Sequence, residues 1–233
     1  MATTPTRSTS TPRPLQRSLT AAVILVLCAF ALLRGWSIVR FTDARTNIAS
    51  NAKEATVLGR WVGVPGLSGS ALETLLASMA NAAGIESARR RAELLTDLLA
   101  VRPLSPADWL SLAGMRLVTM QPYPQVLAAL SMSSITGPDE GWIMWPRGIF
   151  GLLQWQGLAP DARQRAIDDL AGAIEGGTIG STEMRMATIV LESQSPETRA
   201  GIAQRLQVEG LSPTQLASIG LAAPTAGSAS SVP

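Results

Sequence analysis

The sequence predicts an all-α protein, in which one N-terminal transmembrane helix precedes an array of antiparallel helical hairpins. After residue 70, leucine and alanine recur at the three- and four-residue spacing of amphipathic helices. Serine–proline pairs that favour helix starts alternate with glycines that favour helix ends. An uncharged apolar run occupies residues 19–33. Aromatic residues, which favour strands, make up only 4% of the chain.

The N-terminal region is expected to attach the chain to a membrane. Residues 1–17 are rich in Thr, Ser, Pro and Arg, so we expect them to be disordered. The run 19–33 spans only about 22 Å as a helix, whereas the hydrocarbon core of a bilayer is about 30 Å thick. We therefore expect the transmembrane helix to extend over residues 18–39. The alternative is a signal peptide cleaved after Ala29-Phe30-Ala31, which would release the chain into the periplasm.

The orientation of this segment follows from its short basic tail. Arg7, Arg13 and Arg17 precede the apolar run without any acidic residue among them. Such a tail favours a cytoplasmic N-terminus. The sequence therefore predicts a single-pass protein of the bacterial inner membrane, with its C-terminal domain in the periplasm.

The helical domain is predicted to begin at Ser70. Ser70 and Glu73 have the spacing of a capping box, and Gly84 is expected to end the first helix. A second helix is expected over residues 86–101. The predicted regions are, in order, a disordered tail (1–17), a transmembrane helix or uncleaved signal anchor (18–39), a connector (40–69), the helical domain (70–222) and a second disordered tail (223–233).

Residues 104–138 contain the clearest helical hairpin. Ser105 and Pro106 favour a helix start, and the prolines near residue 123 separate this helix from the next. Gly137 is expected to close the second helix. The apolar stripes that the two helices should bury are Trp109, Leu112, Ala113 and Leu117 in the first, and Val126, Leu127, Leu130 and Ser134 in the second.

This hairpin resembles a tetratricopeptide (TPR) repeat. Trp109, Leu112 and Ala113 match the W-x-x-L-[GA] pattern of that family, and Pro138 lies near its closing proline. Arg116 stands where the family usually carries tyrosine. The resemblance implies a TPR-like module that binds another protein. TPR-like proteins with one N-terminal anchor commonly serve envelope assembly and polysaccharide synthesis or export.

Further hairpins are expected on the C-terminal side. Pro146 is predicted to kink or break the chain before a strongly apolar helix over residues 147–155. The expected helices then cover residues 160–174, 181–192, 195–210 and 212–221. The predicted hairpins are 70–101, 104–137, 139–175 and 180–210, with the last helix as a cap.

The candidate binding residues surround a tryptophan cluster. Trp142, Trp145 and Trp155 can form an aromatic platform for a sugar ring or an apolar peptide, or they can fill the core between hairpins. Three charged residues near the cluster either orient a ligand or serve as helix-end charges and a surface pair. These residues are Asp139, Glu140 and Arg147.

Composition argues against catalysis and cofactors. The chain has no histidine and one cysteine, Cys28, which excludes His-dependent nucleophiles, intrachain disulfides and Cys/His metal sites. The carboxylate pair Asp168/Asp169 is adjacent in sequence, so the two side chains diverge on a helix. Beyond residue 17 the chain carries 16 basic and 17 acidic residues, too even a balance for nucleic-acid binding.

The sequence thus predicts a non-catalytic, membrane-anchored scaffold without cofactor or metal. Its expected partner is another membrane or envelope protein. The alternative is a periplasmic glycan-binding module that uses the tryptophan cluster.

Overall fold

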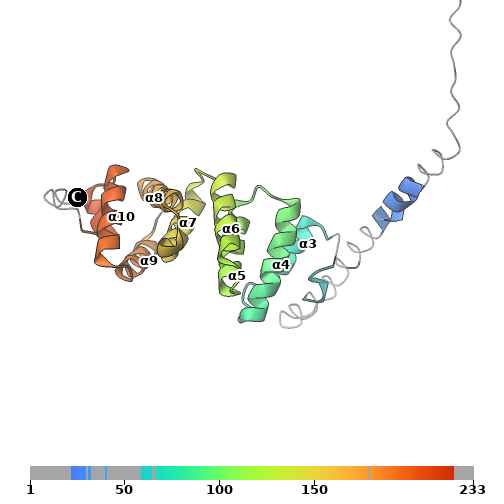
Figure 1. Ribbon diagram of the computed structural model, residues 1–233. Coiled ribbons are helices and arrows are strands. Elements are labelled where there is room, and N and C mark those ends of the chain that lie inside the picture. Colours follow the sequence, from blue (N-terminus) through green and yellow to red (C-terminus); the bar gives the residue numbers. More distant parts are fainter. Residues whose placement is uncertain are drawn as a thin grey trace, which may run out of the picture. The chain divides into compact units, whose positions relative to one another are not determined.

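The computed structural model describes residues 22–29, 31–32, 40, 59–64, 67–177 and 179–222 (Figure 1). Within these ranges the regular secondary structure is helical, which confirms the all-α prediction for this part of the chain. The chain divides into two compact units between Asn81 and Ala82. The predicted hairpin over 70–101 spans both units and stays a prediction.

The first unit contains a helical stretch at residues 22–29 and 31–32, a 3₁₀ turn η1 (Gly59–Trp61) and helix α3 (Gly69–Ser78). Among the described residues, no helix is both long enough and apolar enough to cross a membrane. Much of the predicted transmembrane helix over 18–39 lies outside the described residues, as do both predicted disordered tails. These expectations therefore stay predictions.

Helix α3 begins one residue before the predicted Ser70. Its N-cap is Ser68, whose side chain accepts a hydrogen bond from the backbone N–H of Ala71 at 3.3 Å. The predicted cap at Ser70 is wrong because Ser70 is already the second residue of the helix, and Ser68 caps it instead. The helix also ends at Ser78, short of Gly84, which instead has a φ of 98° and precedes the next helix.

The second unit consists of consecutive antiparallel helix pairs (Figure 1). Helix α4 packs on α5, α5 on α6 and α7 on α8, whereas α9 packs on α7 and α10 packs on both α8 and α11. The bounds of these helices are α4 (Ile85–Val101), α5 (Pro106–Val118), α6 (Tyr123–Thr136), α7 (Gly141–Leu153), α8 (Pro160–Glu175), α9 (Ser181–Glu192), α10 (Pro196–Val208) and α11 (Pro213–Ser218), with a 3₁₀ turn η2 (Trp155–Gly157) after α7.

The main core joins α7 to α11. Glycines on α7 let α8 approach closely, because a Cβ added to Gly148 would lie 2.7 Å from Leu170 Cγ. The largest fully buried side chains of this core are leucine and isoleucine, at positions 152, 167, 170, 191, 202, 206 and 211. Helical periodicity in the sequence predicts the inward faces of α8 and α10, and the residues on both faces are buried in this core. These residues are Ala166, Ile167, Leu170 and Ile174 in α8, and Ile202, Ala203 and Leu206 in α10.

Helix α7 differs from its prediction. It runs without a break from Gly141 through Pro146 to Leu153. Pro146 is the sixth residue of the helix and its side chain is exposed. Because proline has no N–H, the helix loses only the backbone hydrogen bond to the carbonyl of Trp142 in its first turn. The predicted break at Pro146 is therefore wrong.

Smaller differences concern α5 and α6. Ser105 is the N-cap of α5, as expected, but its hydroxyl makes no capping hydrogen bond, unlike that of Ser195 at α10. In α6, Ser133 is fully buried and Ser134 only partly so. The buried face of α6 therefore includes Ser133 in place of the predicted Ser134. The periodicity of apolar residues cannot predict a buried serine that makes a polar contact.

Candidate partner-binding groove

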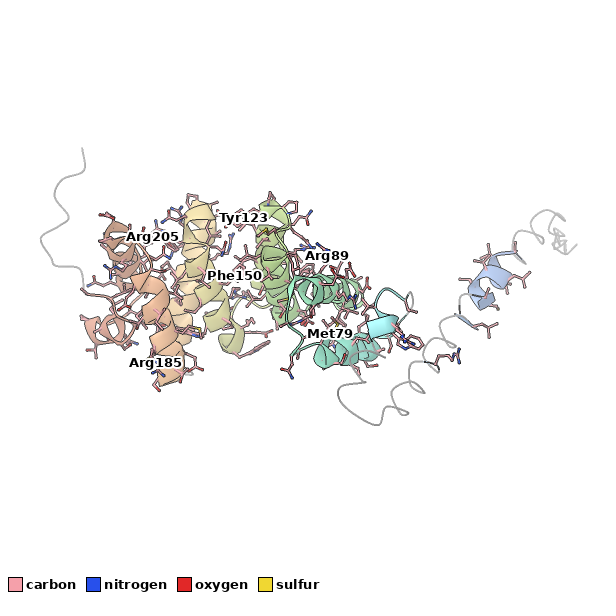
Figure 2. All side chains as sticks on the ribbon, turned by 90° about the horizontal axis from the view of Figure 1, so that it is seen from below. Met79, Arg89, Tyr123, Phe150, Arg185 and Arg205 are labelled. Carbon is pink, nitrogen blue, oxygen red and sulfur yellow. The ribbon has the colours of Figure 1, made fainter. Side chains whose placement is uncertain are left out.

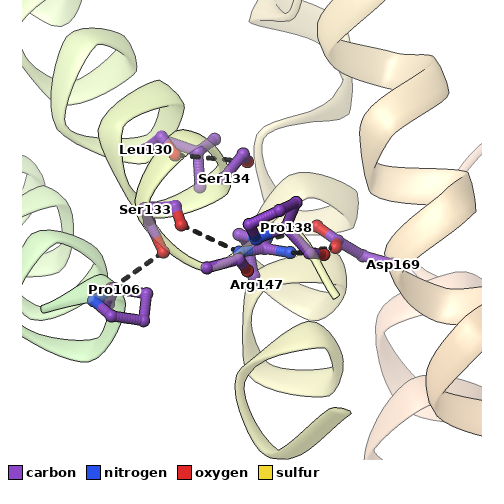
Figure 3. A network of polar contacts seen from close by, with 8 residues as sticks. Pro106, Leu130, Ser133, Ser134, Pro138, Arg147 and Asp169 are labelled. Carbon is purple, nitrogen blue, oxygen red and sulfur yellow. Dashed lines mark hydrogen bonds and ion pairs between the residues drawn. The ribbon is translucent and has the colours of Figure 1, made fainter. Parts of the chain in front are cut away.

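The second unit contains a buried guanidinium that connects three helices. Arg147 of α7 is only 2% exposed, and its Nε donates to Asp169 Oδ2 on α8 at 2.7 Å. Its Nη2 donates to Asp169 Oδ1, which makes the ion pair bidentate. Figure 3 shows this pair between the end of α6 and the middle of α8.

The remaining N–H groups of Arg147 bind the C-terminal end of α6. Nη1 donates to the carbonyls of Ser133 and Gly137 at 2.9 and 2.8 Å, and Nη2 donates to that of Pro138 at 3.1 Å. A guanidinium has five N–H donors, and here each one has an acceptor. The positive charge also lies where the helix dipole of α6 favours it. Arg147 therefore caps α6 and holds it to α8.

A second buried contact extends this network to α5. The Ser133 hydroxyl donates to the carbonyl of Pro106 in the first turn of α5 at 2.8 Å (Figure 3). Ser133 thus uses its hydroxyl for α5 and its carbonyl for Arg147. Helices α5, α6, α7 and α8 are joined through these side chains.

Burial acts on the acidic partner of the pair. Desolvation raises the pKa of Asp169 above its usual range, while the hydrogen bonds and the charge of Arg147 act in the opposite direction. Asp169 is 5% exposed. The pair is therefore a structural element whose two side chains are almost entirely shielded from solvent.

An open groove of about 290 Å³ lies above this pair, between α6 and α8. Arg147 and Gly151 of α7 are at its floor, one helical turn apart. Most of its walls are small or aliphatic. The lining residues of α6 are Pro124, Leu127, Ala128, Leu130, Ser131 and Ser134, and those before and in α8 are Leu158, Ala159, Asp161, Ala162, Arg165, Ala166 and Asp169.

Two exposed charges stand on the α8 wall of the groove. Arg165 Nη1 donates to Asp161 Oδ2 at 3.1 Å, one helical turn away. The hydrogen bond from Arg165 and its charge lower the pKa of the Asp161 carboxyl. The Arg165 side chain is 44% exposed, and this bond uses one of its five N–H groups. The groove thus combines an apolar surface with an exposed ion pair, since the Asp161 side chain is 70% exposed.

The three predicted tryptophans do not share one surface. Trp145 and Trp155 are 9% and 7% exposed and belong to the core. The guanidinium groups of Arg163 and Arg205 lie 5.6 and 5.9 Å from the centre of the Trp155 ring, and Figure 2 labels Arg205 on α10. Of the three indoles, Trp142 alone is exposed, at 62%.

The predicted charged residues also separate. Asp139 and Glu140 are exposed before α7, and a Glu140 carboxylate oxygen accepts a hydrogen bond from Trp142 Nε1 at 2.9 Å. Arg147 is the buried residue described above, so the alternative of an Asp139/Glu140/Arg147 surface pair is not formed.

The sequence reasoning missed Asp169 as the partner of Arg147. Asp169 occupies a position on the same face of α8 as Ala166 and Ala173, both buried. A carboxylate on a buried stripe, together with an arginine on a strongly apolar helix, is the signal that could have indicated the pair.

Within the described residues, no group of three or more acidic or cysteine side chains is placed to hold a metal ion. The fold and the groove define a class of protein, an all-α domain of stacked helical hairpins. Comparison with known protein families, curated proteins and solved structures finds no match for the chain.

Proposed function

We propose that this chain is a non-catalytic, membrane-anchored module that binds another protein. Its helical region acts as a TPR-like scaffold, and residues 18–39 hold it in a bacterial inner membrane with the C-terminal domain in the periplasm. The envelope setting, including polysaccharide synthesis or export, rests on the resemblance of residues 104–138 to a TPR repeat.

The groove between α6 and α8 is the observation that carries this proposal. Helical-repeat proteins bind partners on surfaces formed by successive repeats. Here two successive hairpins, α5–α6 and α7–α8, leave an apolar groove whose floor is fixed by Arg147. The glycan-binding alternative is less well supported because Trp145 and Trp155 are buried.

Site-specific photo-crosslinking tests the binding site in cells. A photo-crosslinking amino acid replaces Ala128, an exposed residue in the groove lining, or Ala200, an exposed alanine of α10 outside it. We expect one defined protein adduct from position 128 that is lost when Ala162→Trp fills the groove. The same adducts from position 200, or none from position 128, would refute the groove as the site.

The anchor is tested separately. The full chain should stay in the membrane fraction after alkaline carbonate washing, and a chain starting at residue 40 should not. A periplasm-dependent enzyme fused after residue 222 should be active. Release of the intact full chain by carbonate would refute the anchor without affecting the groove.

A further inference from the structure

The chemistry of the groove indicates what kind of partner segment it accepts. We propose that its occupant is an amphipathic helix of the partner protein, whose aliphatic side chains enter between α6 and α8 and whose carboxylate pairs with Arg165. This inference rests on the proposed function and adds the conformation and the charge of the bound segment.

The spacing of the lining residues supports a helix. On α6 the wall runs from Pro124 to Ser134, which is about 15 Å at 1.5 Å per residue. Helices that bind in grooves present anchors at positions i, i+3, i+4 and i+7, which cover about 10 Å and therefore fit within this wall. The opposite wall contains Ala159, just before α8, and Ala162 and Ala166 on α8, whose short side chains leave room for a second helix to approach.

The volume sets how much of the partner enters. A groove of about 290 Å³ is at the lower end of the size of ligand pockets, which is about 300–1,000 Å³. It can hold a few aliphatic side chains but not the body of a helix, which is about 10 Å wide. The backbone of the bound helix therefore lies over the groove, within reach of the side chains on its walls.

The charges of the lining favour an acidic partner. Arg147 and Asp169 pair with each other at the floor and are both buried. Asp161 accepts a hydrogen bond from Arg165 and lies in the first turn of α8, where the helix dipole stabilises its charge. Arg165 keeps four further N–H groups and is exposed. A carboxylate on the partner gains these donors, whereas a partner cation would have to compete with Arg165 for the Asp161 carboxylate, which is 70% exposed.

Selection from a displayed library of helical peptides tests the occupant, with the full chain in detergent micelles as the target. A chain carrying Ala162→Trp serves for counter-selection. We expect enriched peptides to combine apolar residues at i, i+3, i+4 and i+7 with Asp or Glu on the neighbouring face. Enrichment of basic peptides, of proline-rich extended peptides, or of nothing beyond the counter-selected background would overturn the proposal.

Affinity measurements on one selected peptide then test Arg165. Replacing the selected Glu by Gln should weaken binding about two- to fivefold, as expected for an exposed ion pair. This difference should vanish in Arg165→Gln, and Ala128→Arg should weaken binding at the other wall. An unchanged Glu-to-Gln ratio in Arg165→Gln would refute the role of Arg165.

The two proposals can fail independently. If crosslinks map a partner to Ala128 but the selected peptides are not acidic helices, only the present inference falls. If the chain self-associates and its crosslinks at Ala128 join two copies, the occupant is a second copy, and the partner helix is refuted. Loss of the Ala128 crosslinks altogether removes the proposed function.

Discussion

Removing the guanidinium of Arg147 should destabilise the helical domain more than removing any exposed arginine. In Arg147→Ala, the Asp169 carboxylate, whose side chain is 7% exposed beside Arg147, loses its partner, and the carbonyls of Ser133, Gly137 and Pro138 lose a donor. Breaking a buried pair by removing one partner costs about 3–5 kcal/mol. That is a large fraction of a typical unfolding free energy of about 5–15 kcal/mol.

Urea denaturation followed by far-UV circular dichroism measures this cost. Arg165→Ala is the matched control, because it removes an exposed arginine whose pair with Asp161 is screened by solvent and contributes little to stability. The double variant Arg147→Met/Asp169→Leu should be more stable than Arg147→Ala, since it leaves no buried charge unpaired. Equal losses for Arg147→Ala and Arg165→Ala would refute the structural role of Arg147.

Two further predictions concern close packing and the exposed pair. Gly148→Ala should lower the free energy of unfolding by about 1–3 kcal/mol, because its Cβ would collide with Leu170. The control Gly201→Ala, with nothing within 4 Å of the new Cβ, should raise that free energy by up to about 1 kcal/mol. Equal effects of the two variants in urea denaturation would contradict the packing of α7 on α8. In an NMR titration the pKa of Asp161 should lie below its usual range and rise in Arg165→Gln. Because the pKa of Asp161 is depressed in the folded state, the pair stabilises the fold above the unfolded pKa of about 3.9. This stabilisation is lost as the pH falls through the folded-state pKa. An unchanged Asp161 pKa in Arg165→Gln would contradict the contact.

Helix bounds were predictable where the start and stop signals were unambiguous. Helix α9 begins and ends at the predicted residues, between the glycines that precede Ser181 and the serine–proline pair at Ser195. At α3 two serines could cap the helix, and Ser68 rather than Ser70 does so. Local sequence cannot separate two nearby caps, because the choice depends on how the preceding chain enters the helix.

The tryptophan cluster illustrates a different limit. Trp142 and Trp145 are three residues apart on α7, yet the first is exposed and the second is buried. Helix α7 is apolar on most sides, so its hydrophobic pattern does not tell which side faces the core. The positions of α8 and α9 determine which side of α7 is buried.

The polar centre could not be predicted from the helical patterns. Arg147 and Asp169 are 22 residues apart and meet because α7 and α8 pack in one particular register. Periodicity predicts the buried face of each helix but not the register between two helices. The small residues Gly148 and Gly151 contribute to this register, because a Cβ at either position would collide with α8.

The same register links the stability of the domain to the shape of its groove. Arg147 binds the C-terminal end of α6 on one side and Asp169 of α8 on the other, and these two helices are the walls of the groove. Arg147 therefore contributes to the distance between the walls, together with the close approach of α7 and α8 at Gly148 and Gly151. Lysine has three N–H donors and cannot make the bidentate pair, so Arg147→Lys would keep the charge but loosen both walls. If the groove accepts a partner helix as proposed, the walls would already be ordered before the partner arrives, which would lower the entropic cost of binding.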